Sequence, residues 1–555
     1  MSEPASFTSA LAERAAELLA GEGGELLLAG DRLDEPTAAL TAAGWRVTAL
    51  ARGAEEARRL RSAGAAAVVE DGDELLAGAP EAEGGWAAVV LWEAGARLAP
   101  PDGPLARARS LLAPQGRLLV AGAVAPTPHE GPGDGSTGSA GQVAGDEAER
   151  GAAAADPGRP AEAQLPTAPA LVRALYETAY AVVEREAAGD GAVRAASGDR
   201  PARLLLLGRA AEHRVRAYRE GDERAILDLF RRVFQKERGE AHWRWEYDGN
   251  PLGNRRISLA FAPGGELVAQ YAGYPARFHL ALPGRPGRTV SALHIGDTMT
   301  APEVRRVGRG STSLLVRTVR HFYAAYCEGR LGFNYGFNTG KVHRFYKRAV
   351  DNERFEQVPY RVRELPGEPF PVPRGLRARL AGWRVERVER FDERFDDLFR
   401  RVRGDYGLLV VRDARWLAWR YGECPDVEYA TWAVSRRGRM VGWGVFRREE
   451  GPAGPEGPEE PRLVWGDALF ERGRPEAVAL LLAHAAASPE GREAVRIEGW
   501  FPARPAWWGE VLDGLGVVAR PEPQDLGLVY VPFLYDPGPD SPEHLYYTKG
   551  DSDLF

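Results

Sequence analysis

The sequence is short of cysteine, of histidine and of long apolar runs, and each shortage excludes a class of protein. Two cysteines among 555 residues cannot form a disulfide scaffold or a cysteine-ligated zinc ribbon. Nine histidines leave little room for a histidine-rich site, so we expect no metal. No apolar run approaches the roughly 20 residues of a membrane helix, and glutamates interrupt the first 20 residues, unlike a signal peptide. We therefore expect a cytoplasmic protein without a membrane span.

The charge balance has no strong excess of either sign. Lys and Arg total 72 and Asp and Glu total 79, which gives a net charge of −7 and argues against a dedicated nucleic-acid binder. Hydrophobic residues at 44% and charged residues at 27% are typical of globular proteins, and the length predicts three or four domains. The 65 glycines and 41 prolines predict many turns and at least one unstructured segment.

That unstructured segment is predicted at residues 126–165, which contain almost no large apolar side chain. Such a segment cannot bury enough surface to offset its chain entropy, so we expect a disordered insertion or linker. Residues 450–461 have a similar composition between two strand-like runs and are predicted to form a long hairpin loop.

Before the linker, short apolar strands alternate with helices. Strands are predicted at 25–29, 45–50, 67–70, 86–92 and 116–121, and after the linker come a helix at 169–186 and a strand at 202–207. This alternation predicts a parallel α/β sheet.

The order of these elements, together with the segment LARARSLLAPQGRLLVAG, resembles a class I methyltransferase domain with a Rossmann-like sheet. In that family a glycine-rich loop binds S-adenosylmethionine, and a carboxylate at the end of the second strand holds the ribose. Here the first loop, residues 29–34, has the single glycine Gly30, and the second strand ends without an acid. The resemblance implies a degenerate domain at 1–210, acting as a scaffold or binding a protein partner. An active S-adenosylmethionine-dependent methyltransferase is an alternative.

The second half of the chain contains an internal repeat. Trp-x-Tyr-x-x-x-Pro occurs at 245–251 and at 419–425, and Gly-Asp follows downstream at 296–297 and at 466–467. The repeat predicts two copies of one α+β unit, at 211–366 and 377–540, with a tail at 541–555 that either folds back onto a groove or frays. Because the Trp-x-Tyr motifs occur in both copies, we interpret them as packing anchors.

Only the first copy carries a basic, glycine-rich turn. A strand at 291–299 is followed by Pro302, by Gly308-Arg309-Gly310, and by a helix predicted to begin near Ser311 and run to Tyr326. Amide groups and the positive end of a helix form an anion site, and glycines let a diphosphate approach the backbone. The segment predicts a diphosphate-bearing ligand.

The string TAPEVRRVGRG within this segment resembles the acyl-CoA signature of the GNAT N-acetyltransferases, and the repeat resembles their double-domain members. The resemblance implies tandem GNAT-like α+β domains that use acetyl-CoA or another acyl-CoA as co-substrate. It assigns cofactor binding to Met299, Thr300, Arg305, Arg306, Val307, Gly308, Arg309, Gly310, Ser311 and Asn338.

The resemblance also implies the catalytic parts. Tyr346, eight residues after Asn338, is the candidate acid for the departing thiolate. His294 and Asp297 are candidate bases; they are three residues apart and face opposite sides of a regular strand unless a bulge intervenes.

Three further residues are candidates for the acceptor pocket: Glu246, Tyr271 and Tyr274. Structural roles stay open beside the functional ones: a core histidine for His294, a core tyrosine for Tyr346, a helix N-cap for Asn338 and a structural carboxylate for Asp297.

We therefore expect an N-acyltransferase that acts on a primary amine, either of a small molecule or of a protein. The second copy, which lacks the CoA loop, would shape the acceptor pocket. A non-catalytic interaction protein built from degenerate enzyme domains is the other alternative.

Overall fold

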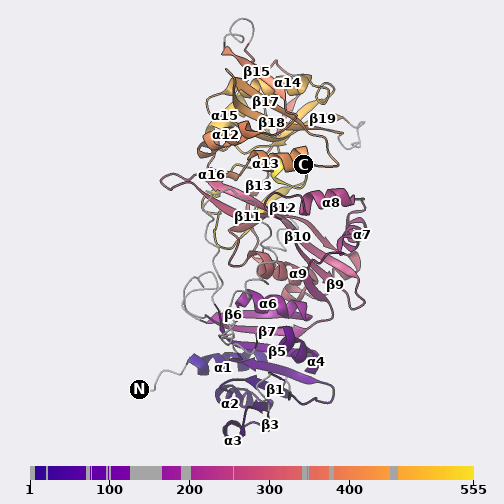
Figure 1. Cartoon of the computed structure of the whole chain (residues 1–555), viewed down its shortest axis with the longest axis vertical. Coiled ribbons are helices and arrows are strands. Elements are labelled where there is room, and N and C mark those ends of the chain that lie inside the picture. The colour runs from indigo at the N-terminus through magenta and orange to yellow at the C-terminus, as the bar shows by residue number, and fades with distance from the viewer. Residues whose placement is uncertain are drawn as a thin grey trace, which may run out of the picture.

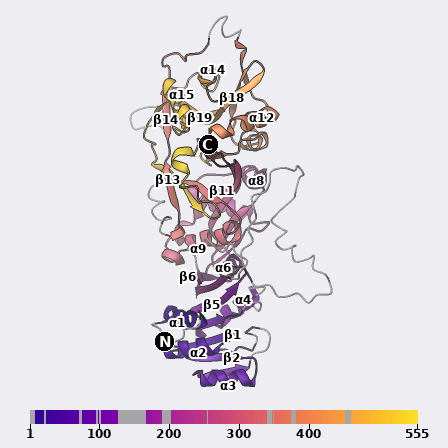
Figure 2. The same cartoon turned by 90° about the vertical axis from the view of Figure 1, so that its left-hand side faces the viewer.

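The computed structural model describes residues 7–20, 23–70, 75–76, 78–94, 98, 102–125, 166–188, 202–253, 255–339, 347, 349–373, 381–450 and 460–555. The predicted linker 126–165 and most of the predicted hairpin loop 450–461 lie outside these residues. Three sheets follow one another along the long axis of the molecule, and the C-terminus lies where the second and third sheets meet (Figure 1, Figure 2). Among the described helices, none is long and apolar enough to cross a membrane.

The N-terminal sheet has seven strands in the order β3-β2-β1-β4-β5-β7-β6. All neighbours are parallel except β7, which runs antiparallel to both β5 and β6. Buried side chains cover both faces of the sheet, as its nearly continuous apolar strands require. Its strands are β1 (Glu25–Gly30), β2 (Arg46–Ala51), β3 (Ala67–Glu70), β4 (Trp86–Trp92), β5 (Leu112–Val124), β6 (Tyr180–Ala188) and β7 (Ala202–Ala210). Its helices are α1 (Phe7–Leu19), α2 (Asp34–Ala42), α3 (Ala54–Ser62), α4 (Asp102–Leu111) and α6 (Ala168–Glu177).

The long helix predicted at 169–186 is wrong in its second half. Helix α6 ends at Glu177, and the chain turns through Ala179, whose φ of 60° is left-handed. The chain then continues as the edge strand β6. The sheet is consequently mixed, where the sequence predicted a parallel one.

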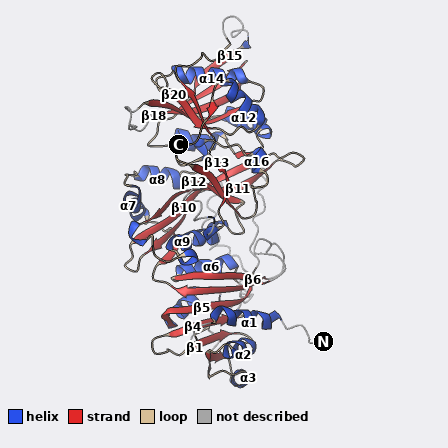
Figure 3. Cartoon of the chain, turned by 180° about the vertical axis from the view of Figure 1, so that it is seen from behind, coloured by secondary structure: helices blue, strands red, loops and turns tan. Residues whose placement is uncertain are grey.

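The second and third sheets are built mainly from the two repeats. The second has the order β13-β22-β12-β11-β10-β9-β8, with β16 also paired to β10, and the third has the order β15-β17-β18-β19-β20-β14-β21. Helices flank the sheets (Figure 3). Strands of the first repeat are β8 (Arg214–Ala217), β9 (Arg256–Phe261), β10 (Leu267–Leu280), β11 (Arg288–Thr300), β12 (Phe333–Thr339), β13 (Glu353–Gln357) and β14 (Tyr360–Glu364). Those of the second are β15 (Trp383–Arg387), β16 (Leu408–Val410), β17 (Ala430–Arg436), β18 (Arg439–Glu450), β19 (Pro461–Phe470), β20 (Arg496–Trp500), β21 (Val518–Ala519) and β22 (Leu526–Pro532).

The helices of the two repeats follow the same order. In the first repeat they are α7 (Glu223–Phe234), α8 (Glu240–Tyr247) and α9 (Leu314–Phe322). In the second they are α12 (Glu393–Val402), α13 (Ala414–Leu417), α14 (Pro475–Ala487) and α15 (Ala506–Gly514), followed by α16 (Ser541–His544) in the tail.

The two repeats exchange one strand each. Strand β22, from the end of the second repeat, lies between β12 and β13 of the first and is antiparallel to both. Strand β14, from the end of the first repeat, lies between β20 and β21 of the second, again antiparallel to both. The predicted boundary between the repeats, from 366 to 377, remains a prediction about the sequence. In the structure, each of the two sheets contains one strand from the other side of that boundary.

A pair of tryptophans marks the approximate two-fold relation between the repeats. Trp245 and Trp419 stack with ring centroids 5.3 Å apart. Each indole N–H donates to the backbone carbonyl of the other residue, at 2.6 Å from Trp245 and 2.8 Å from Trp419. Such reciprocal contacts are the signature of a two-fold interface, here formed within one chain. The interpretation of the Trp-x-Tyr motifs as packing anchors agrees with this contact.

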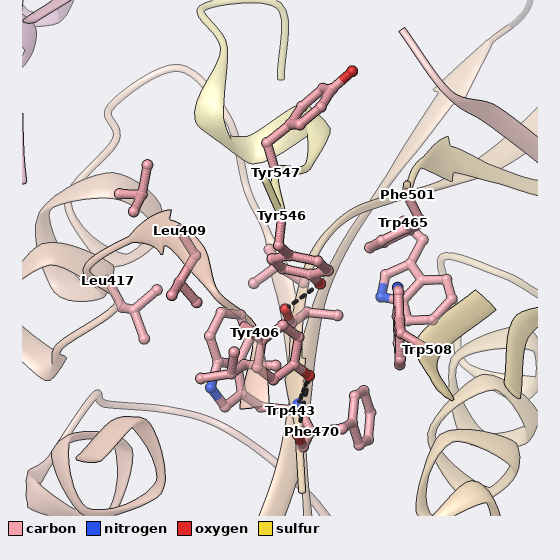
Figure 4. Close-up of a cluster of buried hydrophobic side chains, with 14 of the residues drawn as sticks. Tyr406, Leu409, Leu417, Trp443, Trp465, Phe470, Phe501, Trp508, Tyr546 and Tyr547 are labelled. Atoms are coloured by element: carbon pink, nitrogen blue, oxygen red, sulfur yellow. Dashed lines mark hydrogen bonds between the residues drawn. The ribbon is translucent and has the colours of Figure 1, made fainter. Parts of the chain in front are cut away.

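The C-terminal tail folds back into the core between these sheets. Tyr546 is fully buried and donates through its hydroxyl to the carbonyl of Ala468 at 2.8 Å. Its ring packs edge-on against Tyr406, whose hydroxyl donates to the carbonyl of Phe470 at 3.0 Å (Figure 4). The tail was predicted either to fold back or to fray, and in the structure it folds back.

The N-terminal sheet is docked on the first repeat close to the basic turn. Arg185 of β6 makes two 2.9 Å hydrogen bonds to the carboxylate of Glu328. Glu177 at the end of α6 lies 3.2 Å from Nε2 of the buried His321 on α9. Strand β6 also lies against the 3-10 turn Gly310–Thr312, so the N-terminal sheet supports the loop discussed next.

Candidate functional site

The basic turn connects the end of β11 to the start of α9. A 3-10 turn at Pro302–Val304 leads into it, and a second one at Gly310–Thr312 leads out. The helix begins at Leu314, later than the predicted start near Ser311, because Ser313 still has an extended backbone with ψ of 137°. The positive end of a helix therefore lies directly behind the turn.

The predicted cofactor residues differ in exposure. Six of them are exposed to solvent: Arg305, Arg306, Gly308, Arg309, Gly310 and Ser311. Val307 is half-buried, and Met299 is 1% exposed, with its side chain in the core shared with the N-terminal sheet. Thr300 and Asn338 are half-buried near the ends of β11 and β12. A ligand on the turn would therefore meet arginines and backbone, while Met299 packs behind it.

The two glycines of the turn, Gly308 and Gly310, have different structural roles. Gly308 has φ of 72°, and a Cβ placed there would lie 2.1 Å from the carbonyl oxygen of Thr312. Gly310 has φ of 54°, but a Cβ there would meet nothing within 4 Å. Gly308 is needed for the fold of the turn, whereas Gly310 leaves open space above the backbone, as a site for a bulky anion requires.

Strand β11 contains the bulge that the two candidate bases require. Gly296 is opposite Ala272 and Met299 is opposite Gln270, so β11 has one residue more than β10 at this point. Asp297 lies in the bulge with φ of 48°. With this extra residue the regular alternation no longer places the two candidates on opposite faces. His294 lies 3.9 Å from the carboxylate of Asp553, and the charge of Asp297 acts on the same carboxylate.

Asp297 belongs to a buried polar cluster with three other residues. It accepts a hydrogen bond from the Tyr247 hydroxyl at 3.0 Å and pairs with the Arg238 guanidinium. Arg238 also donates to Glu246 at 3.1 Å. Burial, followed by the nearby charge of Asp297, raises the pKa of Glu246 above its usual range. Burial also raises the pKa of Tyr247, which stays protonated as the donor.

The second repeat contains a counterpart of this cluster. Asp467 accepts from the Tyr421 hydroxyl at 2.8 Å and from Nε of Arg412 at 3.0 Å. Arg412 is fully buried and also binds Asp551 of the tail at 2.6 Å. Because the second repeat has no basic glycine turn, the shared cluster serves the fold, and the structural role left open for Asp297 is favoured over that of a base.

Sequence reasoning missed the arginines of both clusters. Arg238 and Arg412 have the same 174-residue offset as the stacked tryptophans, so aligning the repeats seven residues upstream of each Trp-x-Tyr motif would have found them.

His294 is buried in an aromatic environment. Its ring stacks on Tyr274 with centroids 4.7 Å apart and meets Tyr335 edge-on at 5.2 Å. Neither ring nitrogen has a hydrogen-bond partner among the described residues, and Nε2 lies 3.9 Å from a carboxylate oxygen of Asp553. Burial lowers the pKa of His294 to about 3, so the ring is neutral at pH 7. The expected core histidine is therefore buried, but it is not satisfied.

The two tyrosines predicted to line one pocket are separated. Tyr274 shares the face of His294, whereas Tyr271 packs edge-on against Phe322 of α9 at 5.1 Å, within a different core cluster. The two tyrosines do not line one pocket, because they are three residues apart on β10 and therefore face opposite sides of the sheet. Tyr346, the candidate acid, lies outside the described residues.

A family model described as an acetyltransferase (GNAT) domain matches residues 214–348. Residues 214–348 are a GNAT acetyltransferase domain. No curated protein matches the chain in a sequence search.

Several solved structures are similar to this chain at low sequence identity. A probable N-acyltransferase from Enterococcus faecalis is 13% identical, with a TM-score of 0.42 over 59% of this chain and 74% of its own. A GCN5-related N-acetyltransferase from Anabaena variabilis is 13% identical, with a TM-score of 0.41 over 57% and 72%. One from Kribbella flavida is 17% identical, with a TM-score of 0.40 over 57% and 70%.

The matched segment contains the site but not all of the sheet that carries it. The GNAT domain begins at β8 and reaches past β12, so it includes the bulge, the basic turn and α9. The strand beside β12 is β22, which lies far beyond the matched residues. The GNAT domain thus depends on the second repeat for a neighbour of its own strand β12.

An apolar crevice lies beside the domain where β12, β22 and the tail meet. It is narrow, with a cavity volume of about 10 Å³. The walls are almost entirely aromatic and aliphatic, with one carboxylate: Phe278, Phe333, Tyr335, Phe337, Phe355, Leu408, Leu528, Leu545, Tyr547 and Asp551. It adjoins the His294 environment through Tyr335.

Proposed function

We propose that the GNAT domain transfers an acyl group, in the first instance acetyl, from acyl-CoA to a primary amine. The observation that carries this proposal is the exposed turn with Arg305, Arg306, Arg309 and an open Gly310, set in front of the first turn of α9. Backbone amides, a helix N-terminus and arginines together favour a diphosphate. The cofactor residues named from the sequence are retained, with Met299 as support behind the turn.

The chemistry follows the geometry of β11 and its surroundings. A base removes a proton from the ammonium group, the resulting amine attacks the thioester carbonyl carbon, and the thiolate leaves with a proton from an acid. By resemblance Tyr346 supplies that proton. We assign Asp297 a structural role, since Arg238 and Tyr247 occupy its carboxylate. We propose that His294, neutral and without a hydrogen-bond partner in the described structure, borders the acceptor.

The second repeat is proposed to support the acceptor side without binding CoA. Between β19 and α14 it has a short turn without the Gly-x-Gly sequence. Its contribution to the first repeat is physical: it donates β22 to the sheet and the stacked Trp419 to the interface.

The N-terminal sheet is proposed to be a methyltransferase-like scaffold. Its alternating helices and strands and its Rossmann-like order support this resemblance. At the end of β1, a Cβ on Gly30 would lie 1.7 Å from the carbonyl oxygen of Trp92, and the next amide donates to that oxygen at 2.9 Å. Close pairing of the chain at this point leaves little room for a cofactor, which favours the degenerate domain over an active methyltransferase.

The proposal is tested by calorimetric titration of the full chain with acetyl-CoA, beside Gly310→Glu. The new side chain enters open space, so the left-handed φ of Gly310 should cost only about 1–2 kcal/mol of stability, while a negative charge is placed where the diphosphate would lie. Saturable binding to the parent and weak binding to the variant would support the CoA site and justify a screen of amines. Absence of binding to the parent would overturn the proposal and favour an interaction protein.

A further inference from the structure

A row of side chains across three strands of the GNAT sheet has a gap at Gly296. Tyr274, His294 and Tyr335 lie opposite one another on β10, β11 and β12. Two residues further along β11, on the same face, is Gly296. Because this position has no side chain, there is space for a group from another segment above the strand.

The tail of the chain fills that space with a carboxylate. A Cβ on Gly296 would lie 3.0 Å from a carboxylate oxygen of Asp553. The Asp553 side chain is 31% exposed, so the side chain is accessible to solvent as well as close to the strand. Arg420 holds the tail in place by donating to the carbonyls of Gly550 at 3.2 Å and Ser552 at 2.8 Å.

The equivalent position in the second repeat receives an apolar ring instead. A Cβ on Gly466 would lie 1.9 Å from the ring of Phe555, which is 4% exposed. The same short tail therefore places a charged group over one Gly-Asp motif and a buried ring over the other.

The charges around Asp553 favour a cationic ligand. Asp297 lies close enough to influence it, with Arg238 and Arg420 acting in the opposite direction. Partial desolvation and then the charge of Asp297 raise the pKa of Asp553 to about 6. Nε2 of the buried His294 lies 3.9 Å from the Asp553 carboxylate, and neither nitrogen of this ring has a hydrogen-bond partner among the described residues. A group that can donate hydrogen bonds to both would satisfy both.

We propose that Asp553 binds the ammonium group of the acceptor over Gly296, and that Phe555 closes the corresponding position of the second repeat. This inference rests on the proposed acyl transfer, since it names the group that holds the acceptor at the same site. The acceptor nitrogen would lie between the tail and the bulge of β11, on the face opposite α9. The tail is then a part of the acceptor site, and Asp553 is a positioning and binding residue.

The experiment uses the full chain with Asp553→Asn, Asp553→Glu and the control Glu543→Gln. Glu543 is 86% exposed and its change removes the same charge from the tail. Thiol release from acetyl-CoA is followed with a panel of primary amines that includes benzylamine. We expect Asp553→Asn to raise KM for the amine at least tenfold and to leave KM for acetyl-CoA within about twofold. Asp553→Glu should recover part of the loss, and Glu543→Gln should match the parent.

If the parent protein is active, the KM of Asp553→Asn for the amine tests the inference. A KM equal to that of the parent would overturn it. A parent that transfers to no amine defeats the proposed function, and calorimetric titration with benzylamine then decides. Binding that weakens at least tenfold in Asp553→Asn supports the assignment of Asp553. Equal binding, or none to the parent, refutes it.

Discussion

Replacing each glycine of the basic turn by alanine should separate its two roles. Both Gly308→Ala and Gly310→Ala place a side chain at a left-handed φ, which costs about 1–2 kcal/mol of stability. Only Gly308→Ala also brings a Cβ to 2.1 Å from the carbonyl oxygen of Thr312. Since ordinary contact begins near 3.4 Å, the backbone of the turn must move by about 1 Å.

A shift of that size is large for a site in which backbone amides bind an anion. Misplacement by about 1 Å can cost about a hundredfold in a positioned site. We therefore expect Gly308→Ala to weaken acetyl-CoA binding by ten- to a hundredfold, about 1.4–2.8 kcal/mol. Gly310→Ala enters open space and should change the affinity less than about threefold.

Calorimetric titration of both variants measures these affinities, and urea unfolding checks that their stabilities fall by similar amounts. Equal affinities for the two variants would refute the reasoning, because it ties binding to the backbone path fixed by Gly308. Loss confined to Gly310→Ala would refute it as well.

Three further predictions test the buried clusters and the strand exchange. Because burial raises the pKa of Glu246 from 4.5 to about 8, the folded chain retains this proton to higher pH than the unfolded chain. The free energy of unfolding should therefore fall as pH rises through that interval, and urea titrations should show a flatter profile for Glu246→Gln; an identical profile would contradict the assignment. Asp467→Asn should lower the free energy of unfolding by about 3 kcal/mol, because it removes a carboxylate from the fully buried Arg412; urea unfolding within 0.5 kcal/mol of the parent, a change typical of surface sites, would argue against it. The fragment 211–366 lacks Leu526–Pro532 and should show no cooperative urea transition alone, but should gain one when co-expressed with the rest of the chain; cooperative folding of the fragment by itself would show that the exchanged strand is dispensable.

The sequence was sufficient where local chemistry decides the structure. Alternating apolar residues identified β11, and the glycines with Pro302 identified the turn after it. The repeat was visible because Trp245 and Trp419 recur with the same neighbours. In each case the signal lies within a few residues of the feature that it predicts.

What the sequence did not reveal depends on contacts between distant segments. Nothing local in β22 distinguishes a strand of its own repeat from one inserted beside β12. Asp553 reaches its position only because the tail packs over Gly296, which lies 257 residues earlier in the sequence.

The two repeats provide an internal criterion for separating structural from functional residues. Both contain the buried Arg–Asp–Tyr arrangement, so that arrangement is explained by the fold alone. They differ in the turn that follows β11 in the first repeat and β19 in the second, and in the group that the tail places over Gly-Asp. By this criterion Asp297, first considered as a base, belongs to the scaffold. The basic turn and Asp553, which the second repeat lacks, are the places where a ligand has to be sought.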